Sequence, residues 1–323
     1  MSTVLFAPRQ PEVILEILRS LTPAGFDVAV ADPGTPEFYQ AAADAEYFLG
    51  FARNMGSEFF RSAPKMRLVQ LTSAGYDQVD VEAARKAGVP VSNNGGANAI
   101  AVAEHTMMLM LATLKRLVWH HNNVVAGTWR IGNLADARVY EVAGKTLGVI
   151  GLGNIGKKVA RRAAGFDMKV IYYDIRRLTE DAEDALGARF VLLAELMRRA
   201  DVVSLHVPLD DSTRGLIGAK EIALMKPSAI IVNTCRGPVI DENALYQALK
   251  SEQIMGAGLD VMVDEPPKPN HPMLALPNVT LTPHSAGPTW DNWWSRFRNG
   301  FDNIERVASG RAPLWVIPEL ASQ

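Results

Sequence analysis

The chain has 323 residues, 48% of them hydrophobic, and a formal net charge of -2 at pH 7. Because single hydrophobic cores stop growing at roughly 250–300 residues, this length predicts two domains. The near-neutral charge, without runs of like charge, argues against nucleic acid as a partner and favours a small molecule. A lone cysteine, no signal-like N-terminus and no apolar run of about 18 residues predict a cytoplasmic location and no membrane partner.

Strand patterns alternate with helical patterns in the first hundred residues. Strands are expected at 4–7, 26–31, 47–50, 68–72 and 89–93, with helices at 13–21 and 35–45. Such alternation predicts the α/β class, with a parallel sheet covered by helices. A Gly-Gly pair at 95–96 then precedes a long apolar stretch, expected to be a helix that enters a second domain, and a polar connection at 118–143.

The strand pattern restarts after this connection. Six candidates follow at the spacing of strand–helix–strand units, within 145–156, 170–174, 201–208, 229–237, 256–261 and 279–284. The last part, from Trp290 to Gln323, predicts one amphipathic helix and a proline-containing tail, too short for a domain, that returns to the first unit. We therefore expect a discontinuous domain of 1–99 and 289–323 and an inserted domain of 100–288.

A glycine motif lies at the start of the inserted domain. Gly151, Gly153 and Gly156, with Asn154 and Ile155 between them, fit G-x-G-x-x-G directly after an apolar strand and before a helical run. In this context the glycines permit a tight turn and close approach of a pyrophosphate, while the helix N-terminus supplies N–H groups. The motif thus predicts a dinucleotide site.

The acid at the end of the next strand indicates which dinucleotide is favoured. Asp174 lies where a carboxylate accepts hydrogen bonds from the adenosine ribose, which favours NAD(H) because it would repel a 2′-phosphate. Arg176 and Arg177 leave NADP(H) open, since they could turn to such a phosphate or be solvated loop residues.

Three further residues end consecutive strand candidates. Arg236, Glu265 and His284 fall at the sheet edge where open α/β sheets bind ligands. Arginine can hold a carboxylate and polarise a carbonyl. Histidine can protonate an alkoxide near neutral pH, and a glutamate bonded to it favours the imidazolium. Together they predict hydride transfer to a 2-oxo acid.

The motifs GLGNIG, YYD, SLHVPL, VNTCRG, LDVMVDEPP and LTPHSAG resemble, in order, those of the D-isomer-specific 2-hydroxyacid dehydrogenases. The resemblance implies an oxidoreductase acting on CH–OH donors, with Arg236, Glu265 and His284 catalytic. It also implies two doubly wound parallel-sheet domains, a flavodoxin-like substrate domain and an inserted Rossmann NAD(P)-binding domain, with the active site between them. A homodimer through the 100–140 region is expected.

The same resemblance assigns further residues. In the loop SAGYDQVD, the N–H groups of Ala74 and Gly75 would bind the substrate carboxylate, and Arg53 either touches the substrate or is a solvated loop residue. The remaining cofactor contacts implied are Val102, His206, Val207, Pro208, Thr234, Cys235, Asp260, Ala286 and Gly287.

Other side chains admit plainer roles. Cys235 is interpreted as a backbone contact with an incidental thiol, not a nucleophile. One tryptophan of Trp290, Trp293 and Trp294 could line the substrate pocket, but core packing or a subunit contact is expected for at least two. The remaining histidines show no metal-ligand spacing, so no metal is expected.

The resemblance defines the type of reaction more closely than it defines the substrate. The loop LTSAGYDQVD looks more like that of glyoxylate or hydroxypyruvate reductases than that of phosphite dehydrogenases. The competing interpretation is a nicotinamide-sensing binding protein of the same fold, as in related transcriptional corepressors, with little turnover.

Overall fold

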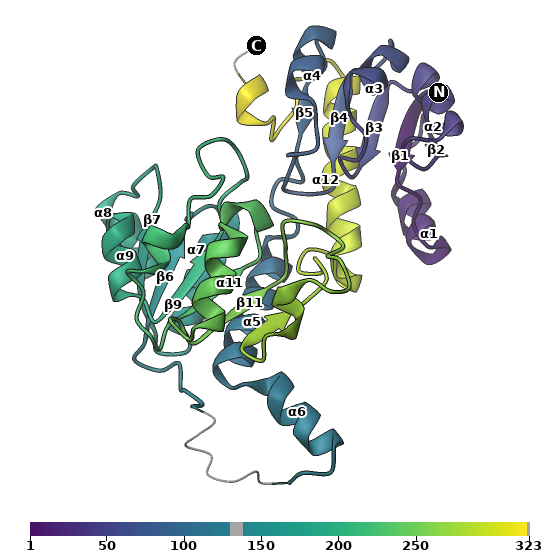
Figure 1. Cartoon of the computed structure of the whole chain (residues 1–323). Helices are drawn as coiled ribbons and strands as arrows, with labels where there is room; N and C mark the ends of the chain where they lie inside the picture. Colours follow the sequence, from purple (N-terminus) through teal and green to yellow (C-terminus); the bar gives the residue numbers. More distant parts are fainter. Residues whose placement is uncertain (130–137, 322–323) are drawn as a thin grey trace. The chain divides into compact units, whose positions relative to one another are not determined.

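A computed structural model describes residues 1–129 and 138–321. The chain divides into two compact units: unit 1 comprises Met1–Asn98 and Pro288–Gln323, and unit 2 comprises Ala99–Gly287 (Figure 1). Each unit holds one parallel sheet, which confirms the predicted fold class of two parallel-sheet α/β domains. Within the described ranges, no helix combines the length and apolar character needed to cross a membrane.

The sheet of unit 1 has five parallel strands in the order β2-β1-β3-β4-β5. They are β1 (Ser2–Ala7), β2 (Phe26–Val30), β3 (Tyr47–Gly50), β4 (Leu68–Leu71) and β5 (Val91–Ser92). Its helices from the first part of the chain are α1 (Glu12–Leu21), α2 (Pro36–Asp44), α3 (Ser57–Ser62) and α4 (Val81–Ala87). The last two were not predicted, because a helix of six or seven residues carries too few turns for a clear periodicity.

Local chemistry sets the ends of these helices. Thr35 caps α2 by accepting from the Phe38 N–H, and Pro36 occupies the first turn, where it costs no hydrogen bond. Asp80 caps α4 in the same way, and Gly88 ends it in the left-handed conformation.

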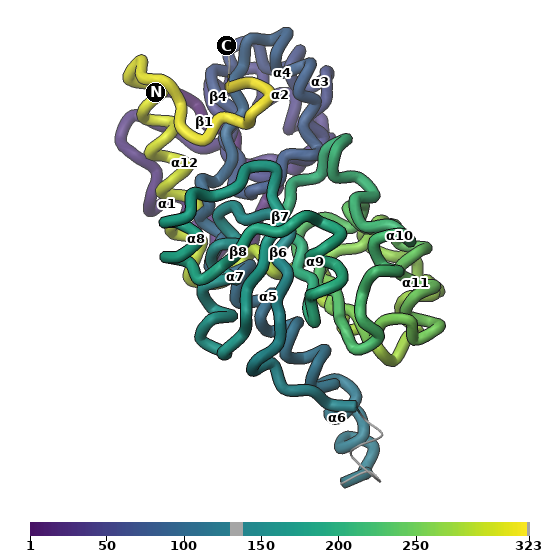
Figure 2. The backbone as a smooth tube through the Cα atoms, turned by 90° about the vertical axis from the view of Figure 1, so that its left-hand side faces the viewer, coloured from purple at the N-terminus to yellow at the C-terminus, as the bar shows by residue number. Residues whose placement is uncertain are grey.

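The C-terminal helix α12 (Trp293–Ala308) belongs to unit 1, where it packs on α1 and β4 (Figure 2). Trp293, Phe297 and Phe301 are buried in the core that it shares with β1 and β3. Beyond it, Val316 makes an antiparallel bridge to Ser92. The segment after residue 287 therefore completes the core of the N-terminal unit.

Unit 2 has a seven-stranded parallel sheet in the order β12-β11-β10-β9-β6-β7-β8. Its strands are β6 (Thr146–Ile150), β7 (Lys169–Tyr173), β8 (Ala188–Phe190), β9 (Val202–Leu205), β10 (Ile230–Asn233), β11 (Gly256–Leu259) and β12 (Val279–Leu281). All six predicted strands are present, and β8 is an addition that was not predicted because the exposed Arg189 interrupts its apolar residues. The strand order reverses between β6 and β9, which is where such sheets bind ligands.

Helices α7 (Asn154–Ala164), α8 (Glu180–Leu186), α9 (Leu193–Arg199), α10 (Ala219–Ile222) and α11 (Glu242–Lys250) connect these strands. The long apolar helix, α5 (Ala99–Leu114), packs on β10, β11 and β12.

The prediction of a polar connection at 118–143 was wrong in its first part. Helix α6 (Leu117–Val125) follows α5 after Arg116, which has a positive φ of 48°. It has no buried residue, and its apolar side chains at both ends flank the polar run His120–Asn123, so the segment resembled a polar connection. In Figures 1 and 2 it projects from the end of α5 away from the sheet of unit 2.

Candidate active site

The chemistry-bearing residues of unit 2 share one edge of its sheet. Each follows the carboxyl end of a parallel strand, and parallel strands present these ends on the same side. The residues are Gly151 after β6, Asp174 after β7, His206 after β9, Arg236 after β10, Asp260 and Glu265 after β11, and His284 after β12.

The glycine loop has the shape of a phosphate cradle. Gly151 has a φ of +89°, and a Cβ there would lie 2.7 Å from the carbonyl oxygen of His206. A Cβ on Gly156 would lie 2.1 Å from the carbonyl oxygen of Gly151, so only glycine lets α7 pack this closely on its strand. Space around Gly153 is open, with no atom within 4 Å of its Cβ position. The loop therefore leaves room for a ligand at Gly153, where no side chain covers the backbone.

Helix α7 and Asp174 complete this cradle. The first hydrogen bond of the helix runs from the Lys157 N–H to the Gly153 oxygen, so the preceding N–H groups are not used within the helix. Asp174 accepts from the Leu152 N–H at 2.7 Å and from the Arg176 N–H at 2.9 Å, which fixes its carboxylate beside the loop. These residues fit a dinucleotide, with the pyrophosphate at the helix N-terminus and the ribose at Asp174.

The two arginines beyond Asp174 differ in their surroundings. Nε of Arg177 lies 3.0 Å from Oε1 of Glu183, and its guanidinium stacks on Phe190. Glu183 is 3% exposed and also accepts from the Tyr172 hydroxyl, so this ion pair holds Arg177 within its own loop. Arg176 makes no side-chain contact within the part of the chain that the structure describes.

His206 stands at the border of this cradle as a neutral side chain. Nε2 lies 2.8 Å from Oγ of Ser204, while Nδ1 is shielded from solvent without a hydrogen-bond partner among the described residues. Burial lowers the pKa of His206 to about 3. Its carbonyl and Val207 pack against Gly151, whereas Pro208 is exposed.

The predicted nicotinamide contacts lie on β10 and α5. Val102 is buried, and its carbonyl accepts from the Thr106 hydroxyl, whose oxygen is 2.9 Å from that of Thr234. Burial raises the pKa of the Cys235 thiol to about 11, and Sγ donates to Oδ1 of Asn233. The raised pKa keeps the thiol protonated near neutral pH, and the interpretation of Cys235 as a backbone contact stays a prediction.

Asn233, which was not predicted, shapes the loop that carries Arg236. Its Oδ1 accepts from the Cys235 N–H at 3.0 Å, and its Nδ2 donates to the Arg236 oxygen at 2.9 Å. Nη1 of Arg236 donates to the Cys235 oxygen at 2.7 Å. The asparagine at the end of the strand could have been identified as a loop-forming residue, since this residue type commonly bonds nearby backbone.

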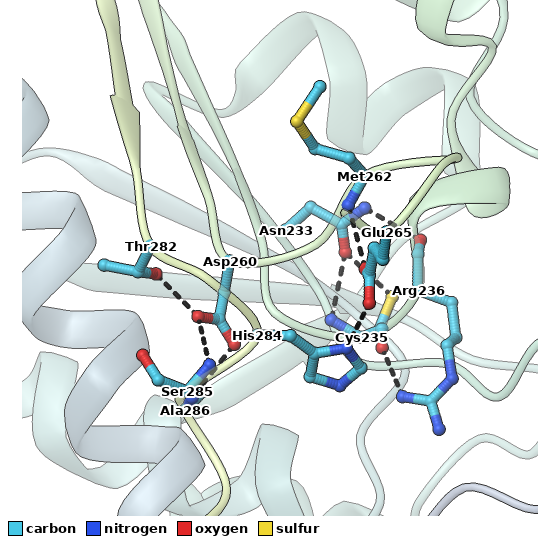
Figure 3. Close-up of polar contacts among 10 residues, drawn as sticks. All are labelled: Asn233, Cys235, Arg236, Asp260, Met262, Glu265, Thr282, His284, Ser285 and Ala286. Carbon is cyan, nitrogen blue, oxygen red and sulfur yellow. Dashed lines mark hydrogen bonds and ion pairs between the residues drawn. The ribbon is translucent and has the colours of Figure 1, made fainter. Parts of the chain in front are cut away.

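His284 and Glu265 form a hydrogen-bonded pair. Nδ1 of His284 lies 2.6 Å from Oε2 of Glu265, and Oε1 of that glutamate accepts from the Met262 N–H at 3.0 Å (Figure 3). Burial acts to raise the pKa of Glu265, but these hydrogen bonds and the charges of His284 and Arg236 outweigh it and lower the pKa. An ionised carboxylate only accepts, so Nδ1 carries hydrogen and Nε2 faces away from the pair. The geometry suits Nε2 to exchange a proton with a ligand.

Asp260 holds the turn in which His284 stands. His284 has a φ of +53°, a conformation that costs a non-glycine residue about 1–2 kcal/mol. Its N–H donates to the Asp260 oxygen at 2.7 Å. The Asp260 carboxylate, 1% exposed, accepts from the N–H groups of Ser285 and Ala286 at 2.9 and 3.0 Å (Figure 3). Gly287, the last of the predicted cofactor contacts, follows Ala286 in the chain. The structure therefore places Asp260 against the loop that carries His284.

Thr282 and His105 also contact this carboxylate and were missed as site residues. His105 is three residues beyond Val102 on α5, so helical spacing could have indicated that both lie on one face. Among the described residues, no group of three or more His, Cys, Asp or Glu side chains is placed to hold a metal ion.

The residues expected to bind substrate in unit 1 lie in loops after its strands. After β4, the Ser73 hydroxyl donates to the Gly75 oxygen at 2.8 Å. The N–H groups of Ala74 and Gly75 make no backbone or side-chain hydrogen bond within the described ranges. After β3, Arg53 is exposed.

The three tryptophans after His284 belong to unit 1. Trp293 is 8% exposed and packs on Phe297, with ring centroids 5.5 Å apart. Trp290 is 59% exposed and meets the ring of Trp294 edge-on at 6.0 Å. Core packing thus accounts for Trp293, and Trp290 offers most of its surface to other contacts.

Comparison with known proteins shows the family to which the chain belongs. Residues 107–286 match the family model for the NAD binding domain of D-isomer specific 2-hydroxyacid dehydrogenases. A glyoxylate reductase of Korarchaeum cryptofilum is 45% identical over 83% of this chain and 79% of its own length. A glyoxylate reductase of Aeropyrum pernix is 38% identical over 94% of this chain and 92% of its own length. The crystal structure of TT0316 protein from Thermus thermophilus superposes with a TM-score of 0.85 at 33% identity, covering 98% of this chain and 99% of that one. The chain therefore belongs to the D-isomer specific 2-hydroxyacid dehydrogenase family, as an NAD(P)-dependent oxidoreductase that acts on CH–OH donors and reduces 2-oxo acids.

Proposed function

We propose that this enzyme reduces glyoxylate, hydroxypyruvate or a 2-oxo acid of similar size, with NADH as the favoured cofactor. The observation that carries the proposal is the pairing of His284 with Glu265 at 2.6 Å in unit 2, at the sheet edge that also presents Arg236. The glyoxylate reductases among its relatives support the substrate class. The loop that contains Ala74 and Gly75 supports a small acid, since it binds through backbone and adds no cationic side chain of its own.

Each side chain has a separate task in this mechanism. A nicotinamide, when bound, supplies the hydride that reaches C2 of the substrate. Arg236 binds the substrate carboxylate and polarises the C2 carbonyl. His284 donates the proton on Nε2 to the developing alkoxide oxygen, and in the oxidation direction takes it back. Glu265 keeps the imidazole oriented through Nδ1 and stabilises its charged form.

The substrate carboxylate has a second set of donors in this proposal. The N–H groups of Ala74 and Gly75 have no internal hydrogen bond within the described residues, which suits them to an anion. Arg53, exposed after β3, would meet the far end of a longer substrate.

The preference for NADH rests on Asp174 and its neighbours. The Asp174 carboxylate keeps acceptor capacity for ribose hydroxyls while it binds two N–H groups. Arg177, which could have neutralised a 2′-phosphate, is instead paired with Glu183. Of the two arginines, only Arg176 has a guanidinium without a contact in the described chain, so NADPH is the weaker partner in this proposal.

We further propose a homodimer formed through the 100–140 region. Residues 130–137 of that region lie outside the described residues. In the rest, α6 and the segment after it expose large apolar side chains that a solvated monomer rarely leaves uncovered: Leu117, Val118, Val124, Val125 and Trp129. Sedimentation analysis tests this dimer. We expect the wild type to be a dimer and Val125→Asp to form a weaker dimer. A monomeric wild type would refute it.

A substrate panel tests the function directly. Oxidation of NADH and of NADPH is followed with glyoxylate, hydroxypyruvate, pyruvate and 2-oxoglutarate, and the kcat/KM values are compared. Turnover of about 1–1000 per second is expected with glyoxylate or hydroxypyruvate. Turnover below about 0.01 per second with every acid would instead indicate a nicotinamide-sensing binding protein. His284→Ala is expected to remove most turnover and to leave NADH binding nearly intact; unchanged turnover would refute the acid–base role.

A further inference from the structure

A histidine on α5 contacts the loop that carries His284. His105 is mostly buried, with 15% of its side chain exposed. Its Nε2 lies 2.9 Å from Oγ1 of Thr282 and 3.4 Å from Oδ1 of Asp260. Helix α5 packs on β11 and β12, which lead into Asp260 and Thr282. The contact therefore joins a helix to the two strands that end at the catalytic loop.

The hydrogen positions in this cluster follow from its geometry. The Thr282 hydroxyl donates to Oδ1 of Asp260 at 2.6 Å, the shortest contact of the group. A hydroxyl has one hydrogen, so the oxygen of Thr282 can only accept from His105. The imidazole of His105 therefore carries its hydrogen on Nε2. The result is a directed chain from His105 through Thr282 to Asp260.

The far end of this chain is the turn at His284. Both oxygens of the Asp260 carboxylate are engaged, Oδ1 with the Ser285 N–H and Oδ2 with the Ala286 N–H. The Asp260 backbone oxygen accepts from the N–H of His284 itself, whose φ is +53°. A non-glycine residue keeps such a conformation only when its surroundings over-determine it. The rotation of the Asp260 carboxylate thus determines whether the two residues that follow His284 keep their hydrogen bonds.

We infer that His105 is a positioning residue for the catalytic reaction. By donating to Thr282 it fixes the hydroxyl rotation and, through it, the Asp260 carboxylate that holds the turn of His284. This role rests on the proposed acid–base function of His284. His105 touches neither His284 nor Glu265 in the hydrogen bonds of the described chain, so it acts only through Thr282 and Asp260.

Two substitutions of His105 separate the hydrogen bond from the volume of the ring. His105→Phe keeps a ring and removes the donor, whereas His105→Gln keeps an N–H donor at similar reach. For glyoxylate reduction we expect His105→Phe to lower kcat about tenfold or more, because small misplacements of a reacting group are costly. The KM for NADH should change by less than about twofold, and His105→Gln should recover most of kcat.

Thr282 provides the second arm, and α5 offers a matched control. Thr282→Val should lower kcat as His105→Phe does, and the double variant should be no worse than either single one, since both break one chain. Thr113 lies on the same helix against Gly258 of β11, with a buried hydroxyl that has no hydrogen-bond partner among the described residues. Thr113→Val should leave kcat unchanged.

Amide hydrogen exchange gives a readout that does not need turnover. The N–H groups of Ser285 and Ala286 should exchange faster in His105→Phe and Thr282→Val than in the wild type and Thr113→Val. Equal exchange in all four proteins, or equal kcat in His105→Phe and His105→Gln, would overturn the inference. If His284→Ala keeps full turnover, the proposed catalytic role fails, while the exchange result still decides whether His105 holds the loop.

Discussion

Nδ1 of His284 lies 2.6 Å from Oε2 of Glu265, and the two residues come from the loops after the neighbouring strands β12 and β11. The contact orients the imidazole and leaves Nε2 outside the pair, where the proposed mechanism needs it. The same contact helps to lower the pKa of Glu265 and so keeps a negative charge beside the imidazole.

Replacing Glu265 with glutamine keeps the side-chain size and removes the charge. We expect turnover in 2-oxo acid reduction at pH 7.5 to fall about 10- to 100-fold, since the imidazolium loses its stabilising partner. Because the pKa of Glu265 is lowered, the wild-type carboxyl is ionised from pH 5 upward, so this fall should extend over the whole rate–pH profile. Steady-state rates from pH 5 to pH 9 measure both effects. Glu195→Gln, which alters an exposed acid paired with Arg199, is the control and should leave the profile unchanged. An unaltered profile in Glu265→Gln would contradict the assigned role.

The discrimination between NADH and NADPH should depend on Asp174. Asp174→Asn retains an acceptor for the Leu152 N–H and loses the charge that repels a 2′-phosphate. We expect the ratio of kcat/KM for NADH to that for NADPH to fall about tenfold, mainly through a lower KM for NADPH. Arg176→Ala should leave the KM for NADH unchanged, because its side chain makes no contact in the described structure. A wild type that prefers NADPH would show that the assignment is wrong.

Acid should destabilise unit 2 through Asp201. Burial acts to raise the pKa of Asp201, but Nζ of Lys226 at 2.8 Å and the Thr146 N–H outweigh it and lower the pKa. A carboxyl whose folded pKa is below its unfolded value stabilises the fold above the unfolded pKa. That contribution is lost as pH falls through the folded pKa.

Asp201→Asn should therefore lower the free energy of unfolding by about 1–2 kcal/mol at pH 7. The difference from the wild type should shrink as pH falls through the lowered pKa of Asp201, because the wild-type side chain then also becomes uncharged. Urea denaturation at pH 7, 4 and 3 measures it. Asp211→Asn, at an exposed carboxylate, should show no difference at any pH. A gap that persists in acid would mean that the ion pair is not its source.

Unit 1 buries a cation, Arg296, that has no acidic partner among the residues that the structure describes. Arg296 is 2% exposed, and burial lowers its pKa to about 10. Its Nε and Nη1 have no hydrogen-bond partner among the described residues, and the guanidinium contacts the rings of Trp293 and Phe51 at 5.3 and 5.9 Å. The desolvation cost of such a charge commonly exceeds what ring contacts return.

Arg296→Met fills the same space without the charge. We expect it to raise the free energy of unfolding by about 1–4 kcal/mol in urea at pH 7. Arg298→Met, at an exposed position on the same helix, should change it by less than about 0.5 kcal/mol. A loss of stability in Arg296→Met would show that stacking on Trp293 outweighs desolvation.

Elements with a strong pattern were predicted, and short or unburied ones were not. The strands of both sheets and helix α5 carry runs of apolar residues long enough to show their period, and the predicted α/β class is confirmed. Strand β8 has the exposed Arg189 at its centre, and α6 has a polar run of four residues in its middle, so neither showed a continuous apolar pattern. A helix or strand can be predicted from the sequence when its buried residues form a periodic apolar pattern.

The sequence by itself determined which residues stand at the functional edge of unit 2. Gly151, Asp174, Arg236 and His284 each follow a strand directly, and parallel strands bring such positions to one side whatever the connections do. Their catalytic and binding roles stay predictions.

Only the tertiary structure decided which partners these residues have. Arg177 turns to Glu183, and His105 reaches Thr282 across 177 positions of sequence, as no local pattern indicates. The physical reason is that a hydrogen bond requires its two atoms within about 3 Å and in line. Strand spacing fixes where the backbone emerges, but the packing of α5 on β11 and β12 fixes which side chains meet.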